Sequence, residues 1–180
     1  MEKLIRPVED TWAPIGVTAA AIEDWEKRTG LRLPAVYRTF MRRYNGGHPF
    51  PLMFRHGLPT DVSPSGDLET LLDTLYQWSV VEEIWSGAAY GHATPPGMLF
   101  IGADIGTLEV LLSVRPEDYG AIYLWRHSLD PWGKGANTRL WPQAGCFSAF
   151  MENLYENDAG DGAAHWHEPV NAALERRLEL

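Results

Sequence analysis

The chain has 180 residues, of which 45% are hydrophobic and 22% charged, and its formal net charge is −9 at pH 7. These values are typical of one soluble globular domain with its own core, and they argue against a disordered chain. Because phosphate contacts need clustered Lys and Arg, the acidic balance argues against nucleic-acid binding and favours a basic partner.

Cysteine usage and the first residues indicate the compartment. Cys146 is the only cysteine, and the sequence opens with Met-Glu-Lys and no apolar segment of the secretory type. No apolar run reaches the roughly 18 residues that cross a bilayer. We therefore expect a cytoplasmic protein that does not bind membranes.

Composition divides the chain into three parts. Residues 1–17 contain Pro7 and Pro14 and are predicted to form an extended lead-in. Residues 18–156 carry regular patterns and are predicted to form the domain. Residues 157–180 begin with an Asn/Asp/Ala/Gly stretch typical of a flexible linker, and a short charged helix or tail follows.

The first helix is predicted over residues 19–29. Thr18 can cap its start and Gly30 can close its end. Ile22 and Trp25 share one side of this segment, so the helix is amphipathic.

The stretch LPAVYRTFMRRYNGG, residues 33–47, predicts a second helix that forms a helical hairpin with the first. Pro34 suits the first helical position, and the Asn-Gly-Gly that follows Tyr44 tolerates a left-handed closing conformation. The large side chains recur at i, i+3, i+4 and i+7 and must face a core. They are Tyr37, Phe40, Met41 and Tyr44.

The next two segments are less regular. Residues 48–66 contain four prolines and are predicted to be a loop with a short edge segment near 52–54. Residues 67–86 fit a helix by their leucine spacing, but residues 72–78 also alternate as in a strand, and periodicity does not decide between the two.

Three β-like runs follow, over residues 98–103, 107–114 and 121–127. The connection 115–120 has Pro near its start and Gly at its end, as in a hairpin, so antiparallel pairing is expected. In the second run one face is apolar and the other is mixed.

A last helix is predicted over residues 146–155, because Phe147, Phe150, Met151 and Leu154 repeat the spacing of the second helix. The predicted fold is therefore α+β: a mainly antiparallel sheet packed with an N-terminal helical hairpin and a C-terminal helix.

The sequence offers weak candidates for chemistry. The two histidines of His165-Trp166-His167-Glu168 do not converge on one helical face, which argues against a metal site. Cys146 opens an apolar stripe and is predicted to be buried in the core. Asp104 and Glu109 are better explained as turn and sheet-surface acids than as an acid/base pair. There is no phosphate-loop or dinucleotide-binding motif. We expect no catalytic residue, metal or cofactor.

Four segments together resemble the SUKH superfamily, which includes the Smi/Knr-like proteins. They are LPAVYRTFMRRYNGG, PPGMLFIGADIG at residues 95–106, YGAIYLWRH at 119–127 and CFSAFMENLY at 146–155. The residues that carry the structural motif are Leu33, Pro34, Tyr37, Phe40, Tyr44, Asn45, Gly46, Gly47, Phe147 and Phe150.

The resemblance implies a compact α+β domain without catalytic activity. It favours a strand over residues 70–77 and a helix over 80–88. Members include fungal regulators of cell-wall synthesis and bacterial immunity proteins that neutralise cognate toxins, often nucleases. The chain departs from the pattern at Thr107-Leu108, where many relatives carry Asn or Asp, and its tail after Asn157 has no counterpart.

These observations lead to one main hypothesis and two alternatives. The main hypothesis is an immunity protein that binds a basic toxin. The first alternative is a regulatory scaffold of the cell-wall-regulator type, and the second is a hydrolase that uses acidic residues. The candidate partner-binding residues belong to the mixed sheet face or its loops: Asp104, Glu109, Glu117, Asp118, Trp125 and Trp132.

Overall fold

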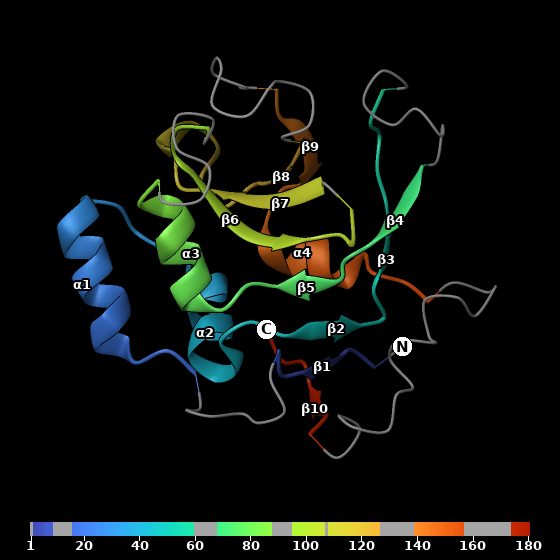
Figure 1. Cartoon of the computed structure of the whole chain (residues 1–180), viewed down its shortest axis with the longest axis horizontal. Coiled ribbons are helices and arrows are strands. Elements are labelled where there is room, and N and C mark those ends of the chain that lie inside the picture. The colour runs from blue at the N-terminus through green and yellow to red at the C-terminus, as the bar shows by residue number, and fades with distance from the viewer. Residues whose placement is uncertain are drawn as a thin grey trace.

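The computed structural model describes residues 2–8, 16–59, 68–87, 95–106, 108–126, 139–156 and 174–180 (Figure 1). The helices in these ranges are α1 (Ala19–Thr29), α2 (Ala35–Tyr44), α3 (Trp78–Trp85) and α4 (Phe147–Glu152). The strands are β1 (Leu4–Arg6), β2 (His48–Phe50), β3 (Met53–Arg55), β4 (Glu69–Leu71), β5 (Thr74–Leu75), β6 (Met98–Ala103), β7 (Leu108–Ser113), β8 (Ile122–Arg126), β9 (Trp141–Ala144) and β10 (Arg176–Arg177). The predicted α+β class is confirmed. None of these helices is long and apolar enough to cross a membrane.

The main sheet has the order β5-β6-β7-β8-β9, and every neighbouring pair is antiparallel. Its three central strands are the predicted ones. The expected hairpin joins β7 to β8 through a 3-10 turn at Pro116–Asp118, and Gly120 completes this turn with φ +89°. Such a φ is easily adopted only by glycine.

Side chains alternate between the two faces of the main sheet and form two apolar groups. On one face Val110 and Leu124 belong to the same core as Phe40 of α2 and Phe147 of α4. On the other face Ile84 of α3 packs with side chains of β6, β7 and β8. Figure 1 shows α3 in front of the sheet and α4 behind it. Both faces of β7 are therefore covered.

The two predicted apolar stripes meet in this core. Tyr37, Phe40 and Phe147 are at most 1% exposed, and the ring of Phe147 lies 5.3 Å from that of Tyr37 and 5.1 Å from that of Phe40. Burial raises the pKa of the Tyr37 hydroxyl far above its usual range. The contact between α2 and α4 thus closes the core, as the spacing predicts.

The predicted ends of α1 and α2 are confirmed with one shift, whereas α4 covers only Phe147–Glu152 of the predicted 146–155. Thr18 Oγ1 accepts a hydrogen bond from the Ala21 N–H at 3.2 Å, and Gly30 ends α1 with φ +71°. Asn45 ends α2 with φ +53°. Pro34 is the residue before α2 rather than its first helical residue, and its ψ of 136° keeps it extended.

Two segment predictions are wrong in part. A loop with one short edge segment was expected here, but residues 48–59 contain two strands, β2 and β3. Pro49 can lie in β2 because it pairs with Ile5 of β1 without donating a hydrogen bond. The strand expected over 70–77 is two short strands, β4 and β5, which join different sheets. The helix expected over 80–88 is confirmed as α3, which begins at Trp78.

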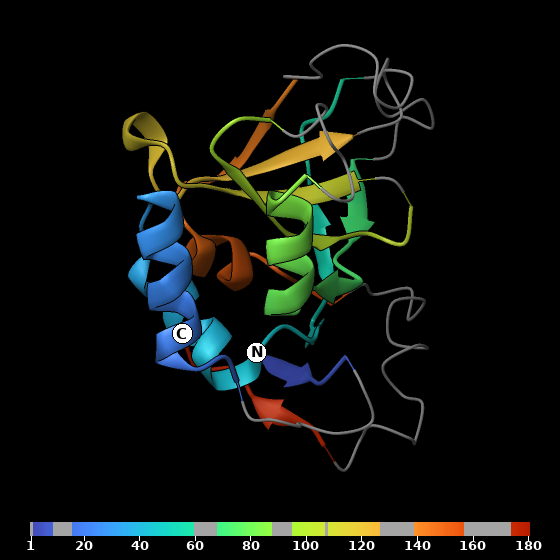
Figure 2. The same ribbon diagram turned by 60° about the vertical axis from the view of Figure 1, so that its left-hand side comes forward.

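Both ends of the chain enter a small sheet of order β10-β1-β2 (Figure 2). The strand β10 corrects the expected helix or tail at residues 176–177, because backbone pairing with β1 fixes an extended conformation. The Tyr44 hydroxyl bonds the Arg177 carbonyl at 2.8 Å, and Leu178 is 9% exposed. The last residues are thereby attached to the end of α2.

Candidate functional site

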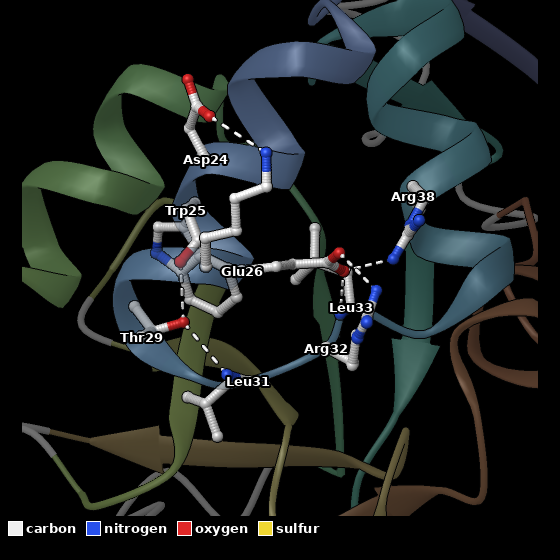
Figure 3. Close-up of polar contacts among 9 residues, drawn as sticks. Asp24, Trp25, Glu26, Thr29, Leu31, Arg32, Leu33 and Arg38 are labelled. Carbon is white, nitrogen blue, oxygen red and sulfur yellow. Dashed lines mark hydrogen bonds and ion pairs between the residues drawn. The ribbon is translucent and has the colours of Figure 1, made fainter.

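A polar cluster with a buried carboxylate at its centre lies where α1 meets the start of α2, around the Glu26 side chain (Figure 3). Glu26 is only 5% exposed. Its carboxylate accepts bonds from the Leu33 N–H at 2.9 Å, from the Arg32 guanidinium at 3.3 Å, and from the Arg38 guanidinium. A buried carboxylate needs such partners because burial without them is costly.

The local sequence explains why the cluster forms. Glu26 lies one helical turn after Ile22 and beside Trp25, on the side of α1 that faces the protein. Gly30 ends the helix and turns the chain back, which brings the Leu33 N–H to the carboxylate. Pro34 then starts α2, which places Arg38 within reach of the same oxygen.

A hollow of about 450 Å³ opens beside this cluster. Its wall contains the cationic side chains Lys27, Arg32 and Arg38, together with Glu23 and Glu26. The Arg32 side chain is 77% exposed and that of Arg38 is 33% exposed. We call the surface formed by Lys27, Arg32 and Arg38 around this hollow the corner surface.

An exposed aromatic side chain adjoins the corner surface. Tyr119, in the β7–β8 connection, is 48% exposed. Its pKa is raised first by partial burial and then by the negative charge of Glu26, while Arg38 and Arg32 oppose the shift. The hydroxyl therefore senses the charges of the cluster. Tyrosine and arginine are both enriched in the centres of protein interfaces.

Two of the predicted partner-binding residues are in the interior. Trp125 is 0% exposed and packs edge-on against Phe100 at 5.3 Å between ring centroids. Glu109 is 4% exposed and accepts a hydrogen bond from the Tyr76 hydroxyl at 2.7 Å. The expectation that they line an exposed mixed face is wrong, because that face of the sheet is buried beneath α3.

Asp104 is engaged within its own turn. Its Oδ1 accepts from the Gly106 N–H at 2.7 Å and from the Leu108 N–H at 3.0 Å, and its Oδ2 accepts from the Thr70 hydroxyl at 3.3 Å. The carboxylate thus fixes the turn into β7, and Asp104 with Glu109 forms no acid/base pair in these contacts.

Asp118 and Glu117 differ although they are neighbours. Asp118 binds the Arg115 guanidinium and accepts a hydrogen bond from the Tyr123 hydroxyl at 2.7 Å. The bond from Arg115 is the largest cause that lowers the pKa of Asp118 well below its usual range. The Glu117 side chain is 67% exposed, and its Oε1 lies 3.7 Å from the Arg115 Nε. Its part in binding stays a prediction.

Cys146 contradicts its predicted burial. It is exposed and precedes α4, so the apolar stripe begins one residue later, at Phe147. Its pKa is lowered first by the hydrogen bond with Ser148 and then by the backbone N–H of Ala149. Among the described residues, no group of three or more His, Cys, Asp or Glu side chains is placed to hold a metal ion.

Trp132 and the segment from His165 to Glu168 lie outside the described residues.

A second hollow, of about 510 Å³, is lined by Phe54, Arg55, Gln143, Asn153 and Tyr155, between β3 and the C-terminal end of α4.

The sequence reasoning missed Glu26, Arg32, Arg38 and Tyr119. A signal for the first exists in the sequence: Glu26 completes an i, i+4 pattern with Ile22 and so puts an acid on the apolar stripe of α1. Arginines at positions 32 and 38 follow it closely enough to supply the countercharge.

The corner surface and the core between α2 and α4 both fall within a match to a known family, which extends from residue 16 to residue 153. This range runs from just before α1 to just after α4 and leaves out β1 and β10. Comparison with curated proteins gave no match. The chain belongs to the SMI1 / KNR4 family (SUKH-1).

Proposed function

We propose that this protein is an immunity-type binding protein, which occludes an essential surface of a toxin and performs no chemistry on it. The observation that carries the proposal is the family membership over residues 16–153. It is supported by the corner surface, where the exposed Arg32, the partly buried Arg38 and the neighbouring Tyr119 offer the side chains that interfaces favour.

The charge distribution suggests how a basic toxin is attracted. Of the 24 acidic and 15 basic side chains, the described residues hold 16 and 14. Segments 9–15, 60–67 and 157–173 contain seven acidic side chains and no Lys or Arg. Most of the acidic excess therefore belongs to these three segments. Such charge accelerates the encounter with a basic protein, whereas contacts at the interface determine how slowly it dissociates.

The direct test is co-expression and capture with the toxin domain encoded beside this gene. The expected result is a stoichiometric complex in which the toxin loses its activity. A chain that neither captures nor protects against any toxin encoded beside it contradicts the proposal.

A charge variant tests the mechanism. Replacing the seven acids of segments 9–15, 60–67 and 157–173 by amides should slow association with the toxin by about tenfold or more at low salt, with little change in dissociation. High salt should remove the difference between the variant and the wild type. An equal loss at low and high salt would contradict electrostatic steering.

Membership of a family that includes fungal regulators of cell-wall synthesis favours a second candidate, an intracellular regulatory scaffold without a toxin partner. Gene context separates the two. A neighbouring gene for a large secreted protein with a C-terminal toxin domain supports immunity, and an isolated gene supports regulation.

A further inference from the structure

We infer that the corner surface binds a carboxylate carried by an acidic side chain of the partner, with Arg32 and Arg38 as the binding residues. The inference deepens the proposed function, because it names one group that the bound protein contributes. A basic protein also has acidic side chains, and one of them is placed here.

The first argument is the number of unused donors. Each guanidinium has five N–H donors, and within the described part of the chain Arg32 and Arg38 each use one of them on Glu26. The Nε of Arg38 is moreover buried without a hydrogen-bond partner among these residues. A buried N–H that lacks an acceptor is costly. The Arg32 side chain is 77% exposed, so its remaining donors can reach an incoming carboxylate.

The second argument is preorganisation. Glu26 is buried, and Figure 3 shows the guanidinium groups of Arg32 and Arg38 directed at its carboxylate. Both arginines line the hollow. The arginines therefore lose less conformational freedom on binding than free surface side chains do. Planar guanidinium groups match carboxylate geometry, often with two parallel hydrogen bonds.

The third argument is the charge and size of the hollow. Its wall contains three cationic and two acidic side chains, and Glu26 is already engaged by Arg32, Arg38 and Leu33. Lys27 Nζ lies 3.8 Å from Asp24 Oδ1, and the Lys27 side chain is 73% exposed. The volume of about 450 Å³ accommodates the end of an acidic side chain and the peptide around it.

The test is an NMR titration of the full chain with an acetylated and amidated tetraglutamate peptide, with the tetraglutamine peptide as its neutral match. Sodium phosphate is titrated separately. The expected result is saturable movement of the Gly30, Leu31 and Leu33 amide signals with the glutamate peptide only. Equal response to both peptides, or none to either, overturns the inference. A response to phosphate without one to the peptide also overturns it, because the site then takes a free anion.

Variants locate the binding residues. R32Q should weaken peptide binding by about tenfold, since one charge-assisted contact is lost. R32K should recover part of the loss. Arg177, in β10 at the other end of α2, is a matched control, because it too is exposed and has one long ion pair, at 3.5 Å to Glu2. R177Q should bind as the wild type does, and equal losses in R32Q and R177Q overturn the inference.

The outcome is separable from the proposed function, because the peptide titration uses no toxin. A protein that captures its toxin but ignores the glutamate peptide keeps the function and loses the inference. A protein that binds the peptide through Arg32 but captures no toxin encoded beside its gene keeps the inference and loses the proposed function.

Discussion

Two buried acids in this molecule differ in what surrounds them. Glu26 is 5% exposed and Glu109 is 4% exposed, so burial alone does not distinguish them. The Glu26 carboxylate accepts hydrogen bonds from two guanidinium groups and lines an open hollow. Glu109 accepts a bond from the Tyr76 hydroxyl on a sheet face beneath α3. The first acid organises a surface, whereas the second belongs to an interior.

The comparison shows that a charged residue in a sheet pattern does not mark an exposed face. The mixed face of β7 was expected to meet a partner, but Leu111 and Trp125 of this face pack with Ile84 of α3. The charged surface formed instead at a helix corner, where the countercharges come from a nearby loop and helix.

The largest expected effect comes from Trp125, one of the two tryptophans that were predicted to be at an interface. W125A should destabilise the fold by about 3–5 kcal/mol, because it leaves a cavity next to Phe100. Urea unfolding followed by circular dichroism measures the change. W125F, which keeps a ring, should lose clearly less. A stable W125A chain would contradict the assignment of Trp125 to the core.

The next effect concerns Glu26. E26Q should destabilise the fold by about 3 kcal/mol, because two guanidinium groups lose their buried countercharge and the Leu33 N–H loses a charged acceptor. Glu23, three residues earlier in α1 and exposed, gives the matched control: E23Q should change stability by less than about 0.5 kcal/mol. Similar losses in both variants would show that Glu26 does not hold the corner together.

A smaller effect should depend on pH at the β7–β8 turn. Because Arg115 lowers the pKa of Asp118 in the native state, Asp118 adds stability above its unfolded pKa of about 3.9. That stability is lost as the pH falls from there through the lower native value. D118N should cost about 2 kcal/mol at pH 7, and its difference from the wild type should shrink below about pH 4. Urea unfolding at pH 7 and pH 3 measures this, and a constant difference would contradict it.

How far the sequence predicted these features depends on how local their causes are. The stripes that begin at Tyr37 and Phe147 were predicted because helical spacing within ten residues determines them. The packing of α3 over Trp125 was not predicted, because Ile84 and Trp125 are about 40 residues apart in the sequence and no local pattern connects them. The predicted burial of Cys146 was wrong by one position. Cys146 precedes α4, so the apolar stripe of that helix begins at the next residue, Phe147.

The candidate site shows the same division. Leu33 and Pro34 were recognised as a helix start, but the role of the Leu33 N–H as a donor to Glu26 depends on a contact between two elements. The pairing of β10 with β1 joins opposite ends of the chain, and no local pattern at Arg176 or Arg177 indicates it.

The smallest expected effect completes the comparison of the two acids. E109Q should cost less than E26Q, because an amide oxygen can still accept the bond from the Tyr76 hydroxyl. Y76F removes the hydroxyl that donates this bond, whereas E109Q keeps the bond, so Y76F should cost more than E109Q. Urea unfolding of both variants beside E26Q gives the order E26Q, then Y76F, then E109Q. If E109Q equalled E26Q, the negative charge of Glu109 would matter as much as that of Glu26, and the contrast between a surface-organising acid and an interior one would fail.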